Sequence, residues 1–304
     1  MTTKNKYRTS VSQRFIFSAL LSCCLSILLL CFSCSKDDST NVIFSGVTLG
    51  KYESRLEVPK LAGGDNLFIQ HSVKIGNDSV MTYCLEYNPA KNHSRWIAFR
   101  FDGLTRDLGS GRTNAWADDP KLPKKYQVGP GAFSRYTRGH LCASYDRQYS
   151  KEANQQTFYM SNMSPMQYDF NGNYWTAFEQ YVQSIGRDAS FADTLYVVKG
   201  GTIDQTQGTV TSSGGKSIVI PRYYFMALLR FKAGDYSAIG FWVEHKDYGY
   251  SGNKYAPDNV VRDKAVNIDE LEKKTGIDFF HNLPNLKEDA IESEDVETLK
   301  KLWF

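Results

Sequence analysis

Residues 133–185 constrain the fold of this chain most strongly, because strand-forming and helical patterns follow one another there in a fixed order. Residues 133–143 mix aromatic and aliphatic side chains with polar ones, and residues 157–160 (Thr-Phe-Tyr-Met) are rich in strand formers. Residues 161–165 (Ser-Asn-Met-Ser-Pro) carry a turn signal. From about Gly172 to Ile185 apolar residues recur every three or four positions, which is a helical period. The pattern predicts a strand, a second strand and a helix.

Strand signals also dominate the rest of the chain. They occur at residues 79–87, 95–101, 194–198, 209–211, 217–230 and 236–243. Helices are expected mainly after Asn171, around 268–275 and near 295–302. Residues 56–304 contain no low-complexity linker or internal repeat, which fits one domain. The expected fold class is therefore α+β, with a mixed, mostly antiparallel central sheet that carries the strand-strand-helix unit on one face.

The polar residues of this unit suit the hydrolysis of a phosphodiester, which needs a base, a cation and further positive charge. His140 can act as the base, since an imidazole titrates near neutral pH. Arg138 can grip phosphate with its planar guanidinium, and Gly139 between them permits a close approach. Asn171 offers an amide oxygen that suits Mg²⁺.

Asn171, Trp175 and Glu179 lie four residues apart and therefore near one face of the helix. Eight helical residues advance about 12 Å along the axis, too far for Asn171 and Glu179 to bind one ion directly. We therefore expect Glu179 to accept hydrogen bonds from metal-bound water. Trp175 is expected in the core.

With these blocks the sequence resembles the DNA/RNA non-specific endonucleases of the ββα-metal superfamily. The resemblance rests on Arg138-Gly139-His140, on residues 161–165, and on the Asn171, Trp175 and Glu179 series, in the family's order and spacing. It extends over roughly residues 56–286. The resemblance implies an endonuclease that cuts both DNA and RNA and leaves 5′-phosphate ends.

The resemblance also implies a role for each matching residue. His140 would be the general base, Asn171 the direct ligand of Mg²⁺ (with Mn²⁺ or another divalent ion as an alternative), and Glu179 an anchor for the ion's water shell. Arg138 and Arg112 would contact phosphate or stabilise the transition state. Asn162 would shape the site beside His140 and contact substrate.

Two positions depart from the family pattern. Thr137 stands where the family usually has Asp, which removes a carboxylate near the site. Gln183 stands where some members have Arg, so further phosphate contacts are expected from Arg135, Arg147 and Lys151.

Taken singly, each residue has an ordinary structural interpretation. His140 alone would be a structural histidine, Asn171 a helix cap, and Glu179 a solvated charge. His71, His93, His245 and His281 have no neighbours at metal-ligand spacing and are interpreted as structural or surface residues. Two other functions stay open: a catalytically weak or inactive nucleic-acid-binding surface lipoprotein, to which Thr137 points, and a surface lipoprotein that binds glycan or protein.

The N-terminus predicts export. Four basic residues (Lys4, Lys6, Arg8 and Arg14) precede an uncharged, largely apolar run at 15–32, which approaches the length of a membrane span. Ser33-Cys34 and the hydrophilic, acidic stretch after it resemble a bacterial lipoprotein signal. We expect a signal peptide at 1–33, lipidation of Cys34, a tether at 34–55, and an outer-membrane location on the periplasmic or cell-surface face.

Charge and cysteine content add two expectations. Without residues 1–33 the 36 basic residues fall to 32 against 33 acidic ones, so net charge predicts no general affinity for nucleic acid. Residues 121–151, however, hold seven basic residues against Asp146 alone, a patch suited to phosphate. Cys84 and Cys142 are the cysteines of the folded part, and a disulfide and two buried thiols remain alternatives.

Overall fold

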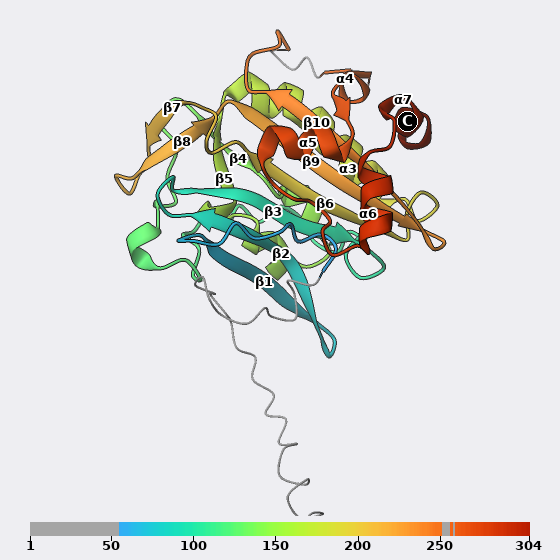
Figure 1. The fold of residues 1–304 in the computed structure, drawn as a ribbon. Coiled ribbons are helices and arrows are strands. Elements are labelled where there is room, and N and C mark those ends of the chain that lie inside the picture. The colour runs from blue at the N-terminus through green and yellow to red at the C-terminus, as the bar shows by residue number, and fades with distance from the viewer. Residues whose placement is uncertain (1–54, 251–255, 258) are drawn as a thin grey trace, which may run out of the picture. The chain divides into compact units, whose positions relative to one another are not determined.

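The structure is a computed structural model that describes residues 55–250, 256–257 and 259–304 (Figure 1). The predicted signal peptide, Cys34 and the tether up to residue 54 lie outside the described residues. Among the described helices, none has the length and apolar content needed to cross a membrane.

The described chain is built on an antiparallel seven-stranded sheet with the order β1-β2-β3-β6-β9-β10-β11. The strands are β1 (Leu67–Ile75), β2 (Asp78–Asn88), β3 (His93–Phe101), β6 (Thr194–Gly201), β9 (Tyr223–Lys232), β10 (Asp235–Glu244) and β11 (Ala265–Val266). The α+β class with a mostly antiparallel central sheet is thus confirmed. The strand expected at 217–230 is two strands, because β8 (Ser217–Pro221) leaves this sheet and pairs with β7 (Thr206–Thr211).

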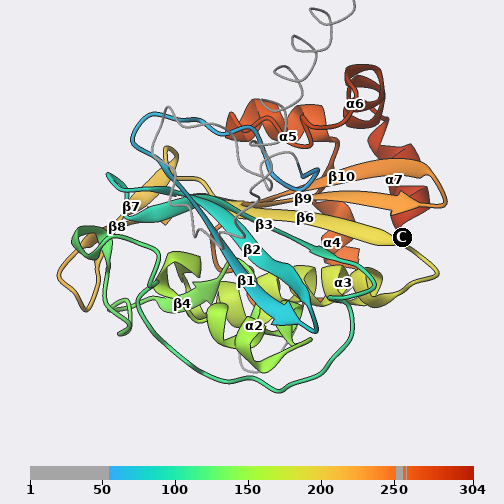
Figure 2. The same ribbon diagram turned by 90° about the horizontal axis from the view of Figure 1, so that it is seen from below.

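Helices cover both faces of this sheet (Figure 2). On one face α5 (Ile268–Thr275) and α6 (Asn285–Glu292) lie over β9 and β10, where Leu271 joins a buried cluster with Trp96. On the other face α3 (Thr176–Arg187) places Phe178 and Val182 in a second cluster with Phe99. The remaining elements are η1 (Lys124–Tyr126), η2 (Ser144–Arg147), α2 (Lys151–Gln156), η3 (Met160–Asn162), α4 (Asn259–Asp263) and α7 (Val296–Trp303).

The strand-strand-helix unit lies on the α3 side, but its second strand differs from the expected one. Strand β4 (Thr137–His140) pairs antiparallel with β5 (Met163–Met166), in the segment that carried the turn signal. Residues 157–160 instead leave α2 and enter η3, and Phe158 is buried there. Pro165 is tolerated in β5 because a two-stranded ribbon leaves one side of each strand without a ladder partner.

After β5 the chain enters the π-helical segment η4 (Phe170–Trp175), which continues into α3. The predicted helix is present, yet the wider π turn was not foreseen. Such turns are rare and occur frequently at functional sites.

Candidate active site

A pocket of about 690 Å³ opens between β4, the η4–α3 helix and the loop that precedes η1. Five of the predicted site residues line it together: His140, Arg138, Asn171, Glu179 and Arg112. Trp116, Tyr136, Thr137 and Tyr145 also line it. Residues as far apart in sequence as Arg112 and Gln183 therefore meet around one cavity.

His140 lies at the end of β4 and is 9% exposed. Its ring lies 5.5 Å from that of Trp116 and meets Phe158 edge-on at 5.0 Å. The Nε2 atom is buried and has no hydrogen-bond partner among the described residues. Burial, reinforced by the charge of Arg112, lowers the pKa of His140 to about 3, so the ring is neutral at neutral pH. A neutral imidazole in a pocket can accept a proton.

Two arginines supply positive charge to this pocket. The Arg138 guanidinium stacks over Trp116, 3.5 Å from the ring centroid, and its Nη1 donates to the Pro130 carbonyl at 2.5 Å. Arg112 lies 4.9 Å from the Phe158 centroid, and its Nε donates to Asn114 Oδ1 at 2.8 Å. No ion pair with a described carboxylate holds either arginine. Their remaining donors can therefore serve an anion.

Asn171 and Glu179 line the same pocket from the helix, and both side chains carry oxygen atoms. Asn171 lies inside the π turn, where its N–H donates to Gln167 O at 2.9 Å, so it is not the helix cap. Neither side chain hydrogen-bonds to another described residue. Burial raises the pKa of Glu179 to about 7, although the Lys199 charge acts in the opposite direction. Hard oxygen donors that lack protein partners can bind a divalent cation or its waters.

A buried ion pair beneath Glu179 was missed by the sequence analysis. Lys199 Nζ lies 2.9 Å from Asp146 Oδ2, and both side chains are fully buried. Asp146 also accepts from Gln183 Nε2 and from the Ala143 N–H, each at 2.9 Å. A lysine within the apolar strand β6 was the available signal, since a buried charge needs a partner.

Close packing between β4 and β5 fixes the position of His140. A Cβ atom on Gly139 would lie 2.3 Å from Sδ of the buried Met166, so glycine leaves the space that the Met166 side chain fills. Asn162 donates to the Cys142 and Thr157 carbonyls at 2.9 and 2.6 Å and accepts from the Cys142 N–H at 2.8 Å. Its amide is fully buried outside the pocket lining, and the expected substrate contact stays a prediction. Asn162 holds the chain that follows His140.

Arg147 also differs from expectation. Its side chain is fully buried, packs 4.6 Å and 4.8 Å from the centroids of Phe99 and Phe101, and donates to Arg100 O at 2.9 Å. A phosphate contact by Arg147 stays a prediction, and it would require the guanidinium to leave this enclosure. Arg135 and Lys151 are exposed outside the pocket lining, and their role stays a prediction. Cys142 is a buried thiol, so no disulfide joins it to Cys84.

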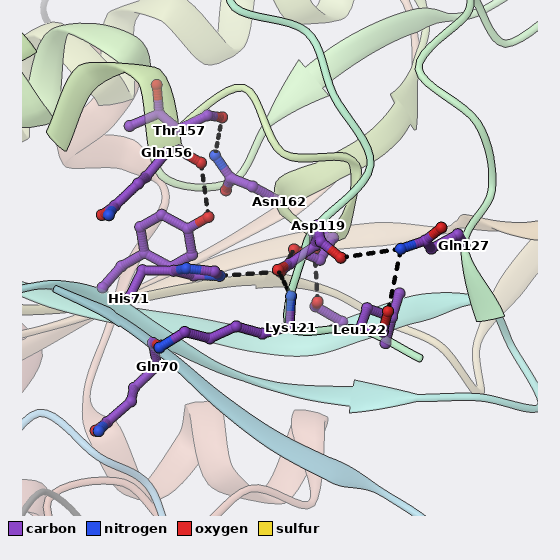
Figure 3. A network of polar contacts seen from close by, with 12 residues as sticks. Gln70, His71, Asp119, Lys121, Leu122, Gln127, Gln156, Thr157 and Asn162 are labelled. Atoms are coloured by element: carbon purple, nitrogen blue, oxygen red, sulfur yellow. Dashed lines mark hydrogen bonds and ion pairs between the residues drawn. The ribbon is translucent and has the colours of Figure 1, made fainter. Parts of the chain in front are cut away.

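A second buried histidine, His71 on β1, lies outside the pocket in a saturated network (Figure 3). Its Nε2 lies 2.9 Å from Asp119 Oδ2, which also accepts from Ser161 Oγ at 2.5 Å. Asp119 Oδ1 accepts from the Lys121 N–H at 2.8 Å. Burial would raise the pKa of Asp119, yet His71 and these donors lower it below its usual value. This network joins β1 to the loop before η1 and to η3.

The chain is similar in sequence to a known family and to proteins named as nucleases. The model of the DNA/RNA non-specific endonuclease family matches residues 64–286. "Nuclease EXOG, mitochondrial" from Xenopus laevis is 28% identical over 217 residues, which are 67% of this chain and 58% of that protein. "Nuclease" from Nostoc sp. is 29% identical over 218 residues, 70% of this chain and 76% of that protein. This chain therefore spans little more than half the length of the Xenopus relative.

A solved structure has a similar fold. The crystal structure of the EndoG/EndoGI complex matches with a TM-score of 0.56 at 16% identity and covers 75% of this chain and 93% of that chain. At this level of identity the likeness concerns the fold alone.

Proposed function

We propose that this chain, which belongs to the DNA/RNA non-specific endonuclease family, hydrolyses phosphodiester bonds of DNA and RNA in the pocket around His140. One observation carries the proposal: a neutral histidine with a buried, unpartnered Nε2 shares a pocket with two arginines that form no ion pair with a described carboxylate. Structural histidines are normally satisfied, so this one is arranged for a ligand or a reaction.

The donor set on the helix fits a divalent metal ion. Asn171 and Glu179 both line the pocket and lack hydrogen-bond partners among the described residues, which suits an oxygen-preferring cation such as Mg²⁺ or Mn²⁺. Asn171 would bind the ion directly, and Glu179 would hold its water shell. When bound, such an ion neutralises charge on the phosphate and stabilises the leaving oxygen.

The protein's own residues then have separate tasks. His140 accepts the proton of the attacking water, which its neutral ring permits. Arg138, fixed between Trp116 and Pro130, and Arg112 bind the phosphate and offset the charge that develops on it. The arriving phosphate also raises the pKa of the imidazole, which favours proton transfer to it. The expected products carry 5′-phosphate and 3′-hydroxyl ends.

The test is digestion of plasmid DNA and of RNA with Mg²⁺, with Mn²⁺ and with EDTA. Wild type and His281→Ala, a matched change outside the pocket lining, should cut both substrates with a divalent ion and not in EDTA. His140→Ala should cut on the order of 10³-fold more slowly. Absence of cutting with every ion would contradict the enzyme, and equal cutting by His140→Ala would contradict the mechanism.

A second function is favoured by one specific residue. Thr137 lines the pocket where the family usually has Asp, and its Oγ1 donates to the Met166 carbonyl at 3.0 Å. A catalytically weak protein that binds nucleic acid would show a gel shift in EDTA without cutting in Mg²⁺.

We also propose that the protein is exported and anchored to the outer membrane by a lipid on Cys34. The basic N-terminus, the apolar run at 15–32 and Ser33-Cys34 support this proposal. Labelling with a radioactive fatty acid should mark the wild-type protein and not Cys34→Ala. Equal labelling of the two would contradict lipidation at Cys34.

A further inference from the structure

Helices α5 and α6 lie on the face of the sheet opposite α3 (Figure 2). Three carboxylates of these two helices form a cluster. Asp269 and Glu272 are three residues apart on α5 and share one helix face. Glu292 is the last residue of α6. One carboxylate oxygen from each residue lies within 4.8 Å of the others.

Glu292 makes this cluster unusual. The residue is 6% exposed, and its Oε1 is buried without a hydrogen-bond partner among the described residues. A buried, unpaired carboxylate is costly, and carboxylates of this kind are normally paired or coordinate metals. Its position adds to the cost, because the C-terminal end of a helix carries partial negative charge. Nothing on α6 offsets this, since its last turn contains no basic residue.

The surrounding charges do not neutralise the cluster. Asp278 and Glu288 add further negative charge, and burial together with these neighbours raises the pKa of Glu292 to about 9 and that of Glu272 to about 7. Lys60 is the basic residue that reaches this region, but its ammonium is exposed and pairs with Asp278 at 3.0 Å. Lys274, on α5, pairs with Glu270 at 3.3 Å.

We propose that Asp269, Glu272 and Glu292 form a calcium-binding site that joins α5 to α6. Calcium binds carboxylate oxygens at about 2.4 Å, so two of its ligands can be up to about 4.8 Å apart. The three oxygens lie close enough together that small side-chain rotations would bring all of them around one calcium ion. Magnesium, with bonds of about 2.0–2.1 Å, needs a tighter set. Glu272 keeps a second interaction, because its Oε1 accepts from the Phe279 N–H at 2.6 Å and is thereby oriented.

The site is structural and separate from the proposed nuclease pocket, since it shares no residue with the pocket lining. Both helices pack on β10, and α5 also contacts β9. An ion between them would fasten α5 to α6 above β9 and β10. With three carboxylates we expect a Kd on the order of 10⁻⁴ M, in the range of calcium sites outside cells.

The first experiment measures thermal unfolding in EDTA and in 10 mM Ca²⁺. We expect Ca²⁺ to raise the Tm of the wild type by about 5 °C. Asn171→Ala should respond equally, because its change lies in the other pocket. Glu292→Gln should not respond, and in EDTA it should be at least as stable as wild type, since an amide cannot ionise beside the neighbouring carboxylates. Glu294→Gln, an exposed neighbour, should respond like wild type.

The second experiment measures binding directly by titration calorimetry with Ca²⁺. Asn171→Ala protein should bind one ion, and the added change Asp269→Asn, which lies on the other helix, should weaken that binding at least tenfold. Nuclease activity of Glu292→Gln in Mg²⁺ should equal that of wild type. The proposal is overturned if Ca²⁺ leaves the wild-type Tm unchanged, or if Glu292→Gln and wild type gain the same stability from it.

Discussion

His140 and His71 are both buried on strands of the same domain, yet their surroundings are opposite. His71 pairs with Asp119 at 2.9 Å, and that carboxylate is further held by Ser161 and the Lys121 N–H (Figure 3). His140 contacts the rings of Trp116 and Phe158, and its Nε2 has no partner among the described residues. One imidazole completes a network, whereas the other borders a pocket.

The difference teaches which buried histidine serves the fold and which serves chemistry. A saturated network strengthens the fold, because removing any member leaves other buried groups unpaired. An unsatisfied imidazole costs stability and is explained by a ligand or a reaction. The two sites should therefore respond oppositely when each is altered.

The largest expected effect is on catalysis. His140→Ala should lower kcat on the order of 10³-fold, since a positioned base contributes about 10²–10⁴. Its Tm should stay close to that of wild type because no hydrogen bond is lost. Initial rates on plasmid DNA and a thermal melt measure both. A large fall in Tm with unchanged rates would instead show that His140 is a structural histidine.

The next effect is on stability. Asp119→Ala leaves His71 and Ser161 without their shared acceptor, and breaking a buried pair of this kind costs about 3 kcal/mol. The Tm should fall by roughly 10 °C, while the rate of the folded enzyme at low temperature stays unchanged. Asp107→Ala, an exposed control, should change neither. A fall in rate without a change in Tm would place Asp119 in the catalytic machinery.

The pH dependence of stability offers a subtler comparison. The folded pKa of His140 is about 3 and the unfolded value is about 6.5, so below pH 6.5 the unfolded chain binds more protons and stability falls with falling pH. His140 alone should account for about 2 kcal/mol of that fall at pH 5. Denaturant titrations in EDTA give the free energy of unfolding at pH 7.5 and at pH 5.0. Between these pH values it should fall less in His140→Ala than in wild type, by this amount. Equal falls in the two proteins would mean that the imidazole is protonated in the fold.

The smallest effect concerns phosphate binding. Arg138→Lys keeps the charge but loses the planar stack on Trp116 and the forked donors, and kcat/KM should fall about tenfold, or about 1.4 kcal/mol. Arg135→Lys, outside the pocket lining, should reduce it less. If Arg135→Lys had the stronger effect, the phosphate would bind nearer the rim than the pocket suggests.

Local signals made part of the fold predictable. Helix α5 begins and ends where expected, because Asn267 caps its first turn through the Glu270 N–H and Gly276 ends it with a left-handed φ of 64°. The second strand of the unit was misplaced by a few residues. Residues 157–160 are strand formers, but burial of Phe158 against Trp116 at the end of α2 overrides that preference.

The pocket was predictable where residue type and spacing specify chemistry, as at His140, Asn171 and Glu179. The burial of Arg147 could not be predicted, because a basic residue in a polar segment gives no indication that it will pack against Phe99 and Phe101. The pairing of His71 with Asp119 joins residues 48 positions apart through a loop, and no local pattern encodes such a contact.

Gly139 contributes to packing within the fold and also lies next to the proposed catalytic base. A Cβ atom there would collide with the buried Met166 side chain, so a substitution would force either Met166 or strand β4 to shift beside the imidazole. In a survey of all single substitutions scored by nuclease activity, Gly139 would rank with the reacting residues although it supplies no reactive group. Intolerance to substitution at this position would reflect the lack of space beside Met166 rather than a catalytic role of the residue itself.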